Sequence, residues 1–338
     1  MTVTKLRHYN FGVEIEAVVK PYGPVESFTN VDWYRQLAQK LRNRDIAAVH
    51  DDCSKYSKHP EYYGGKWFVT RDGSLKRERP MVCMEVVSPR LDTKQPVSRI
   101  LGDFWEAMRV HFSPQRDISC GGHVHVTPVS SHNKFSLRSL KKIAFASVVY
   151  EEFVAAVLPR VRRENQYCRP NSQSTGSGLH ETLMAFGRSK NTLMKVAADI
   201  KSKTSERDLC YYMQGNRYVL WNFANIFPNP KTGKCTGTVE FRGGNQFLST
   251  NGTLAWVAFV MGFITLALEE VSSGAYSYIL SFLTDFQDLI NTLTTFTSSH
   301  DPKFQARLES WWKRIRQAAK ASKLSRFLPE EYIAMNTR

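Results

Sequence analysis

The segment that most restricts the fold lies near the N-terminus, where residues 11–17 read Phe-Gly-Val-Glu-Ile-Glu-Ala. Successive side chains of a β-strand point to opposite faces of a sheet. The apolar side chains of this segment therefore share one face, while Glu14 and Glu16 share the other. Two neighbouring carboxylates repel each other unless a cation or protons lie between them. The segment predicts a strand with one carboxylate-bearing face.

Two further predicted strands carry polar side chains on one face. In residues 81–87, Glu85 is the only charged residue of an apolar run. Carboxylates in such runs are seldom fully buried without a partner. In residues 123–127, His123 and His125 share a face opposite two valines. Two imidazoles on one strand face are commonly structural, but they are also a frequent arrangement of metal ligands.

A fourth strand, predicted at residues 237–241, is followed directly by Arg242, which shares a face with Glu240. Taken alone, this pair is compatible with an exposed ion pair, and a Glu-x-Glu strand with a solvated face. Together the four segments supply four acidic residues, two imidazoles and an arginine. Hard oxygen ligands in that number suit Mg²⁺ or Mn²⁺ better than Zn²⁺. Metal ions beside an arginine are what phosphoryl transfer requires, because both neutralise phosphate charge.

The remaining pattern alternates strands and helices. Further strands are predicted at residues 66–69 and 217–223, and helices at 32–44 with Asp32 as N-cap, 97–112, and 136–158 between Ser136 and Pro159. Residues 160–216 are polar and predict a surface insertion with one or two weak helices. The chain is mostly helical in pattern after Thr253.

An apolar stretch at residues 254–268 is shorter than the roughly 20 residues that a membrane helix needs, and Glu269 and Glu270 end it. It predicts a buried helix rather than a membrane segment, with these core residues: Leu254, Val257, Met261 and Ile264.

Composition narrows the class of protein. The 46 lysines and arginines exceed the 31 acidic residues by 15, which favours anionic partners such as nucleotides, nucleic acid or acidic substrates. The six cysteines form no Cys-x-x-Cys pair, which argues against a disulfide framework and against a thiolate zinc site. The first ten residues are polar and basic, with no apolar signal-peptide core, so we expect a cytoplasmic protein.

An ordered set of motifs resembles the amidoligase family, which is similar to glutamine synthetase and glutamate-cysteine ligase in its catalytic sheet. The resemblance extends over roughly residues 9–270. It rests on these segments: Phe-Gly-Val-Glu-Ile-Glu at 11–16, Asp-Gly-Ser at 72–74, Met-Glu-Val-Val-Ser-Pro at 84–89, Cys-Gly-Gly-His-Val-His-Val at 120–126, Glu-Asn-Gln-Tyr-Cys at 164–168, Asn-Arg-Tyr at 216–218 and Thr-Val-Glu-Phe-Arg at 238–242.

The resemblance implies two Mg²⁺ ions, with Mn²⁺ as a substitute, and ATP. Glu14 and Glu16 would contribute to separate ions; Glu85 would join one, and Glu240 with a histidine of the pair 123 and 125 would hold the other. Arg242 would meet the nucleotide phosphates. Further nucleotide or substrate contacts, implied less directly, are Arg163, Arg217, Asn165, Tyr167 and Asp72, the last of which is also read as a turn residue.

The implied activity is ATP-dependent amide formation through an acyl phosphate, from small-molecule carboxylate and amine substrates, amino acids or a peptide among them. The implied fold is α+β, with a curved, mainly antiparallel sheet of about six strands and helices packed on its convex side, as in glutamine synthetase. We expect one catalytic domain over residues 1–338, with an insertion at 160–216 that covers the active site and a helical part at 253–338.

Two departures from the family pattern stand out. Gly122 occupies the position before the first histidine, where a leucine is common, and residues 243–247 lack the His-x-Gly-Thr run that often follows the arginine. Both concern the acceptor pocket more than the metal site.

Two alternatives come from other classes of function. A metal-dependent amide hydrolase would use zinc held by His123, His125 and a glutamate. A nucleic-acid-binding domain would use the basic surplus and aromatic residues such as Tyr62, Tyr63 and Trp67. Nucleic acid is the less expected partner, because an acidic strand face repels phosphate unless metal ions are bound.

Overall fold

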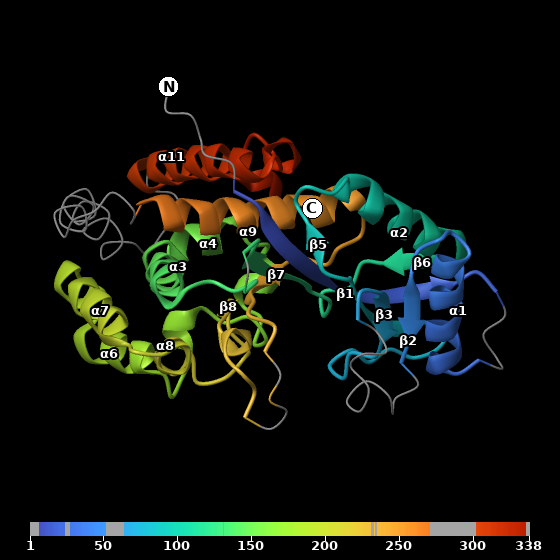
Figure 1. Ribbon diagram of the computed structural model, residues 1–338, viewed down its shortest axis with the longest axis horizontal. Helices are drawn as coiled ribbons and strands as arrows, with labels where there is room; N and C mark the ends of the chain where they lie inside the picture. Colours follow the sequence, from blue (N-terminus) through green and yellow to red (C-terminus); the bar gives the residue numbers. More distant parts are fainter. Residues whose placement is uncertain are drawn as a thin grey trace.

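The structure, a computed structural model, describes residues 7–23, 28–51, 64–130, 132–230, 233, 235–270 and 302–335. Within these residues the fold is α+β, with one open, mixed and largely antiparallel sheet (Figure 1). Its strand order is β2-β3-β4-β1-β7-β9-β8, and the short strands β5 and β6 also pair with β1. Only β2 and β3 run parallel; the other pairs are antiparallel.

The strands are β1 (Tyr9–Pro21), β2 (Ala48–His50), β3 (Trp67–Thr70), β4 (Val82–Val87), β5 (Leu91–Asp92), β6 (Phe112–Gln115), β7 (Gly122–Pro128), β8 (Trp221–Asn222) and β9 (Val239–Gly244). The described sheet thus has nine strands rather than about six. Three additional strands, β2, β5 and β6, are two to four residues long and too short to show an alternating pattern. The strand predicted at 217–223 is reduced to two residues.

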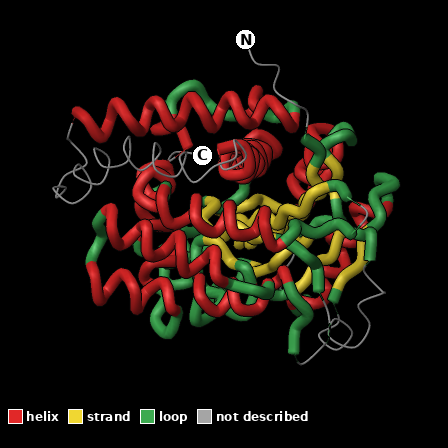
Figure 2. Tube along the Cα trace, turned by 60° about the vertical axis from the view of Figure 1, so that its left-hand side comes forward, coloured by secondary structure: helices red, strands yellow, loops and turns green. Residues whose placement is uncertain are grey.

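The apolar face of β1 forms part of the hydrophobic core. Its alternate residues from Phe11 to Val19 are at most 2% exposed, as the alternation predicts. Helices α1 (Asn30–Arg42), α2 (Val97–His111) and α9 (Thr250–Glu270) contact the strands and join the same hydrophobic cluster. The carboxylates of β1 lie on the opposite face. Figure 2 shows the strands grouped between helical segments.

Helix α9 is a core helix. It is apolar around its whole circumference, which is typical of a helix with protein on all sides, and Leu254, Val257, Met261 and Ile264 are fully buried as predicted. It contacts α2, α3 (Leu137–Val149), β7 and α11 (Pro302–Ala319). By length and composition alone α9 could span a membrane, but 89% of its apolar window is buried inside the protein.

Two local predictions about helices are corrected. The N-cap of α1 is Thr29, and Asp32 closes the capping box from the N3 position, because the two side chains satisfy each other's backbone N–H groups. The helix expected from Ser136 to Leu158 is divided into α3 and α4 (Glu151–Val157), since the backbone of Tyr150 leaves the helical region. Ser136 does cap α3, by accepting from Ser139 N.

The segment 160–216 is more structured than its polar composition suggests. It contains α5 (Arg160–Arg163), α6 (Gly178–Phe186), α7 (Lys190–Ser202) and α8 (Glu206–Met213), and the last two contact α3. Sparse apolar residues at helical spacing place one side of each of the three longer helices in the core: Leu179 and Leu183, then Leu193, Val196 and Ile200, then Leu209 and Met213. A short 3₁₀ turn, η2 (Asn171–Gln173), precedes them. A second, η3 (Ala224–Ile226), follows β8, and three more follow α11: η4 (Lys320–Ser322), η5 (Ser325–Phe327) and η6 (Tyr332–Met335).

Candidate active site

The strand register places the polar residues of four separate segments in one row. Glu16 of β1 lies opposite Glu85 of β4, and Glu14 lies opposite His123 of β7. His125 of β7 in turn lies opposite Glu240 of β9. Directly opposed residues of an antiparallel pair project from the same face and contact each other. The sheet therefore brings together the carboxylates and imidazoles that the sequence separates by more than 200 residues.

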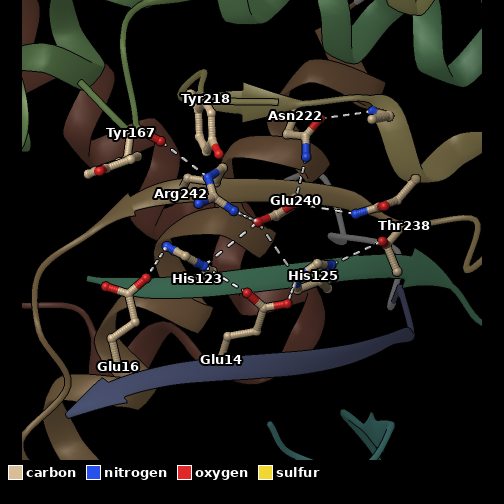
Figure 3. A network of polar contacts seen from close by, with 12 residues as sticks. Glu14, Glu16, His123, His125, Tyr167, Tyr218, Asn222, Thr238, Glu240 and Arg242 are labelled. Atoms are coloured by element: carbon tan, nitrogen blue, oxygen red, sulfur yellow. Dashed lines mark hydrogen bonds and ion pairs between the residues drawn. The ribbon is translucent and has the colours of Figure 1, made fainter. Parts of the chain in front are cut away.

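Glu14 is the centre of this row. Its Oε2 lies 2.8 Å from His123 Nδ1, and its Oε1 lies 2.9 Å from His125 Nε2 (Figure 3). The other ring nitrogen of His125 lies 3.1 Å from the hydroxyl of Thr238. Each histidine thus contacts the same carboxylate through a different oxygen.

Glu240 is almost fully buried, at 3% exposed, and its two oxygens have different partners. Oε2 accepts hydrogen bonds from the side-chain amides of Asn222, at 2.7 Å, and Asn225, at 3.3 Å. Oε1 accepts from Arg242 Nη1 at 2.5 Å and lies 3.8 Å from the nearest nitrogen of each histidine. Oε1 is therefore the oxygen that faces Arg242 and the two histidines (Figure 3).

Glu14, His123 and Glu240 form a candidate metal centre. One donor atom from each lies within 4.8 Å of the other two. Donors around an octahedral Mg²⁺ at about 2.1 Å are separated by up to about 4.2 Å, so a small contraction would allow all three to bind one ion. Two carboxylate oxygens and one imidazole are a donor set that fits Mg²⁺ or Mn²⁺.

Glu16 and Glu85 form an acidic pair beside this centre. Glu16 accepts the backbone N–H of Gly121 at 2.6 Å through Oε2, while its Oε1 lies 3.4 Å from His123 Nε2. Burial, together with the charges of Glu14 and Asp72, raises the pKa of Glu85 well above 4.5. Burial also raises the pKa of Glu16. Both shifts show that negative charge is costly here without a cation.

The pKa values of Glu14 and Glu240 are shifted in the opposite direction, because positive groups lie close to both. Burial alone would raise the pKa of Glu14, but the charge of His125 and the hydrogen bonds of both imidazoles hold it well below 4.5. For Glu240, the effect of burial is likewise outweighed by His125 and Arg242, which lower its pKa. Burial disfavours the charged form of His125, yet Glu240 and Glu14 raise its pKa to about 9. Without a metal ion, the His125 imidazolium and the Arg242 guanidinium are thus the cations that balance these carboxylates.

Arg242 connects the metal centre to an aromatic pair. Its Nε donates to the carbonyl of Tyr167 at 3.2 Å. The ring of Tyr167 meets the ring of Tyr218 edge to face, with centroids 5.3 Å apart, and Tyr218 lies above Arg242 in Figure 3. The guanidinium of Arg217 lies over the Tyr218 ring, 5.3 Å from its centroid.

The other residues singled out from the sequence have local partners. Asn165 Oδ1 accepts from Tyr167 N at 2.8 Å, and so shapes the loop that presents the Tyr167 carbonyl. Arg163 donates to the carbonyls of Leu158 and Ala156, at the end of α4. Asp72 accepts from the backbone and hydroxyl of Ser74, as a turn residue does, although its charge also acts on Glu16 and Glu85.

Three residues that the motifs did not single out belong to the site. Asn222 and Asn225 donate hydrogen bonds to Glu240, and the charge of Arg162 acts on Glu16. Asn222 stands between Trp221 and Phe223 in a predicted strand, and this isolated polar residue was a usable signal. No sequence feature distinguishes Arg162 from the adjacent Arg163.

The two departures from the family pattern are in contact with each other. A Cβ atom built on Gly122 would lie 2.3 Å from the ring of Phe247, which is fully buried. Phe247 therefore occupies the space that a side chain at position 122 would need. Gly122 and Phe247 are therefore sterically complementary in this chain.

The geometry agrees with what sequence comparison finds. No curated protein matches the chain in sequence. A family model described as "Putative amidoligase enzyme" matches residues 7–264. The match includes every strand and every site residue named above, and it ends within α9, before α11. The chain therefore belongs to the amidoligase family, a family of enzymes of the ligase type.

Proposed function

We propose that this protein is an ATP-dependent carboxylate-amine ligase that forms an amide through an acyl phosphate at a two-metal Mg²⁺ site. The observation that carries the proposal is the convergence of Glu14, His123 and Glu240 from three adjacent strands, with Arg242 bonded to the last of them. Family membership supports the ligase class, and the open antiparallel sheet is compatible with a glutamine-synthetase-like catalytic sheet.

The acidic row divides into two sets of ligands. Glu14, His123 and Glu240 would hold one ion, and Glu16 with Glu85 would hold the other. Glu14 lies between the two sets, since it is on the same strand face as Glu16. When bound, the ions would neutralise phosphate oxygens and so reduce the repulsion between ATP and the carboxylate substrate.

The proposed reaction has two steps, phosphorylation of the carboxylate and attack by the amine. An oxygen of the substrate carboxylate attacks the γ-phosphorus of ATP, the bond to the β,γ-bridging oxygen breaks, and ADP leaves. The amine nitrogen then attacks the acyl carbon, the bond from carbon to the phosphate oxygen breaks, and inorganic phosphate leaves. The nitrogen loses a proton to give the amide. The first step converts a poor electrophile into a reactive one.

Arg242 would receive the phosphate charge. It keeps its orientation through Glu240 and the Tyr167 carbonyl, and these two contacts use Nη1 and Nε. No hydrogen bond of Nη2 to another described residue is observed, so this group can donate to a phosphate oxygen. A guanidinium fixed in this way stabilises developing negative charge without reorganising during the reaction.

The two alternatives fit the site less well. The zinc hydrolase needs both imidazoles as ligands, whereas the donor atoms that lie within 4.8 Å of one another come from one imidazole and two carboxylates. For nucleic-acid binding, Tyr62 and Tyr63 lie outside the described residues. Trp67 is buried and stacks on Phe104 with centroids 4.2 Å apart, so it cannot stack on bases.

The test is to supply Mg-ATP, pools of amino acids and small acids, and hydroxylamine as a general amine, and to detect hydroxamates by mass spectrometry. The proposal predicts hydroxamate together with ADP and phosphate, and loss of both when Mg²⁺ is chelated. Metal analysis of the purified protein accompanies the assay. Stoichiometric zinc, with amide hydrolysis that needs no nucleotide, would contradict the ligase proposal.

A further inference from the structure

A buried arginine lies beside Gly121, the residue whose backbone N–H bonds Glu16. Arg162, on the short helix α5, is 2% exposed. Its Nη2 donates to the backbone carbonyl of Arg242 at 2.6 Å. Its Nε is buried and has no hydrogen-bond partner among the described residues. A buried charge with so few hydrogen bonds is costly, which makes Arg162 a candidate for a role beyond packing.

The guanidinium of Arg162 lies flat against the backbone of Gly121. A Cβ atom built on Gly121 would lie 2.7 Å from Nη2 and 2.9 Å from both Cζ and Nη1. Real Cβ atoms essentially never approach other atoms this closely, so position 121 must be glycine while Arg162 keeps its place. The arginine in turn restricts where the Gly121 peptide can lie.

The same residue, Gly121, holds Glu16 through both of its backbone polar groups. The N–H of Gly121 donates to Glu16 Oε2 at 2.6 Å, and its carbonyl accepts from Glu16 N at 3.3 Å. With Oε2 used in this way, Oε1 is the oxygen directed at His123. The positive charge of Arg162 also favours the ionised form of Glu16, against the effect of burial on its pKa.

We infer that Arg162 is a positioning residue for the second metal ion, acting through the Gly121 peptide to fix the Glu16 carboxylate with one oxygen free to bind. This inference rests on the proposed two-metal ligase. Groups that orient metal ligands contribute strongly to metal affinity, and their loss typically weakens binding by about 10- to 100-fold.

The experiment measures Mn²⁺ binding by titration calorimetry, without ATP, on the full chain. Arg162→Met should weaken one of two Mn²⁺ sites by about tenfold or more. Gly121→Ala should do the same although Arg162 is retained, because the new Cβ displaces the guanidinium. In a Glu16→Gln background, Arg162→Met should have no further effect on Mn²⁺ affinity, since the group through which it acts has been removed.

Arg160→Met is the matched control. It removes another arginine of α5, which is exposed and pairs with Glu164 at 3.5 Å, so Mn²⁺ affinity should be unchanged. Thermal unfolding of each variant establishes that the titrated protein is folded, and Gly121→Ala answers the question if Arg162→Met does not fold. Wild-type affinity in both folded variants, or an undiminished effect of Arg162→Met without Glu16, would overturn the inference. A wild-type protein that binds no Mn²⁺ would overturn the proposed function itself.

Discussion

Glu16 and Glu85 lie directly opposite each other on neighbouring strands, on the face that also carries Glu14. Like charges in this position destabilise an antiparallel pair. Burial and the charges of Glu14, Asp72 and Glu16 raise the pKa of Glu85, and burial together with the charge of Asp72 raises the pKa of Glu16. The fold thus brings two repelling carboxylates together at a position where a divalent ion would neutralise their charge.

Glu85→Gln should therefore stabilise the metal-free protein. A carboxyl whose pKa is raised in the folded state lowers stability as pH rises from its unfolded pKa toward its folded pKa, so this cost is already present at pH 7. Removing the charge should increase the free energy of unfolding by on the order of 1 kcal/mol. Thermal unfolding in EDTA at pH 7 measures the effect, and added Mg²⁺ should then stabilise the wild type more than the variant.

Glu106→Gln serves as the control for that comparison, since Glu106 is exposed and pairs with Arg44 at 3.3 Å. It should change stability little, with or without Mg²⁺. If Glu85→Gln were less stable than the wild type in EDTA, Glu85 would have a favourable partner, and the acidic pair would not be a site that needs a cation.

The stability of the metal-free protein should fall as pH rises from about 6.5 to about 9. The pKa of His125 is raised to about 9 against an ordinary value of 6.5, because Glu240 and Glu14 favour the imidazolium despite its burial. A group with a raised basic pKa contributes its stability fully below 6.5 and loses it through 9. The shift corresponds to about 3 kcal/mol at most. Urea unfolding in EDTA across this range measures the loss.

His125→Asn should flatten that profile, because the amide cannot take up a proton. The variant should be less stable than the wild type at pH 6.5 and closer to it at pH 9. A slope that survives in His125→Asn would assign the pH dependence to other groups and would separate His125 from the charge balance of the site.

The alternating strands made most of this site predictable from sequence. In β1 and β7 the two-residue period alone places Glu14 with Glu16 and His123 with His125, whatever the rest of the chain does. The register in which neighbouring strands pair could not be predicted from this two-residue period. That Glu14 meets both histidines, while Glu16 faces Glu85, depends on how β1 aligns with β4 and β7, which local pattern does not encode.

Long-range packing explains what the sequence did not reveal. Arg162 and Arg163 are adjacent and chemically identical, yet one packs on Gly121 and the other bonds carbonyls of α4. The segment 160–216 differs: its apolar residues do recur at helical spacing, but they are sparse within a polar composition, and the contacts of α7 and α8 with α3 show that they are core residues. These distinctions depend on tertiary contacts, which the local sequence does not specify.

Glu14→Gln and Glu240→Gln should each abolish formation of ADP and hydroxamate while the protein remains folded. An amide oxygen is a weaker ligand for a hard divalent ion than a carboxylate. Circular dichroism and thermal unfolding report the fold, and the hydroxamate assay reports turnover. Glu152→Gln, a change at a glutamate paired with Arg188 away from the site, is the matched control. Gross unfolding of both site variants would assign these carboxylates to structure.

Gly122→Ala should destabilise the protein, because the added methyl group would lie 2.3 Å from the Phe247 ring in a filled core. Overpacking of this kind typically costs about 1–3 kcal/mol. Gly73→Ala is the control, since a Cβ there meets nothing within 4 Å. Urea unfolding of both variants gives the comparison.

Phe247→Leu should recover part of the loss when combined with Gly122→Ala, although Phe247→Leu alone removes buried ring volume and destabilises the protein. A double variant more stable than the sum of the single changes predicts is the signature of two residues that share one space. Strict additivity would show that the backbone moves to accept the methyl group, and that the two departures from the family pattern are independent of each other.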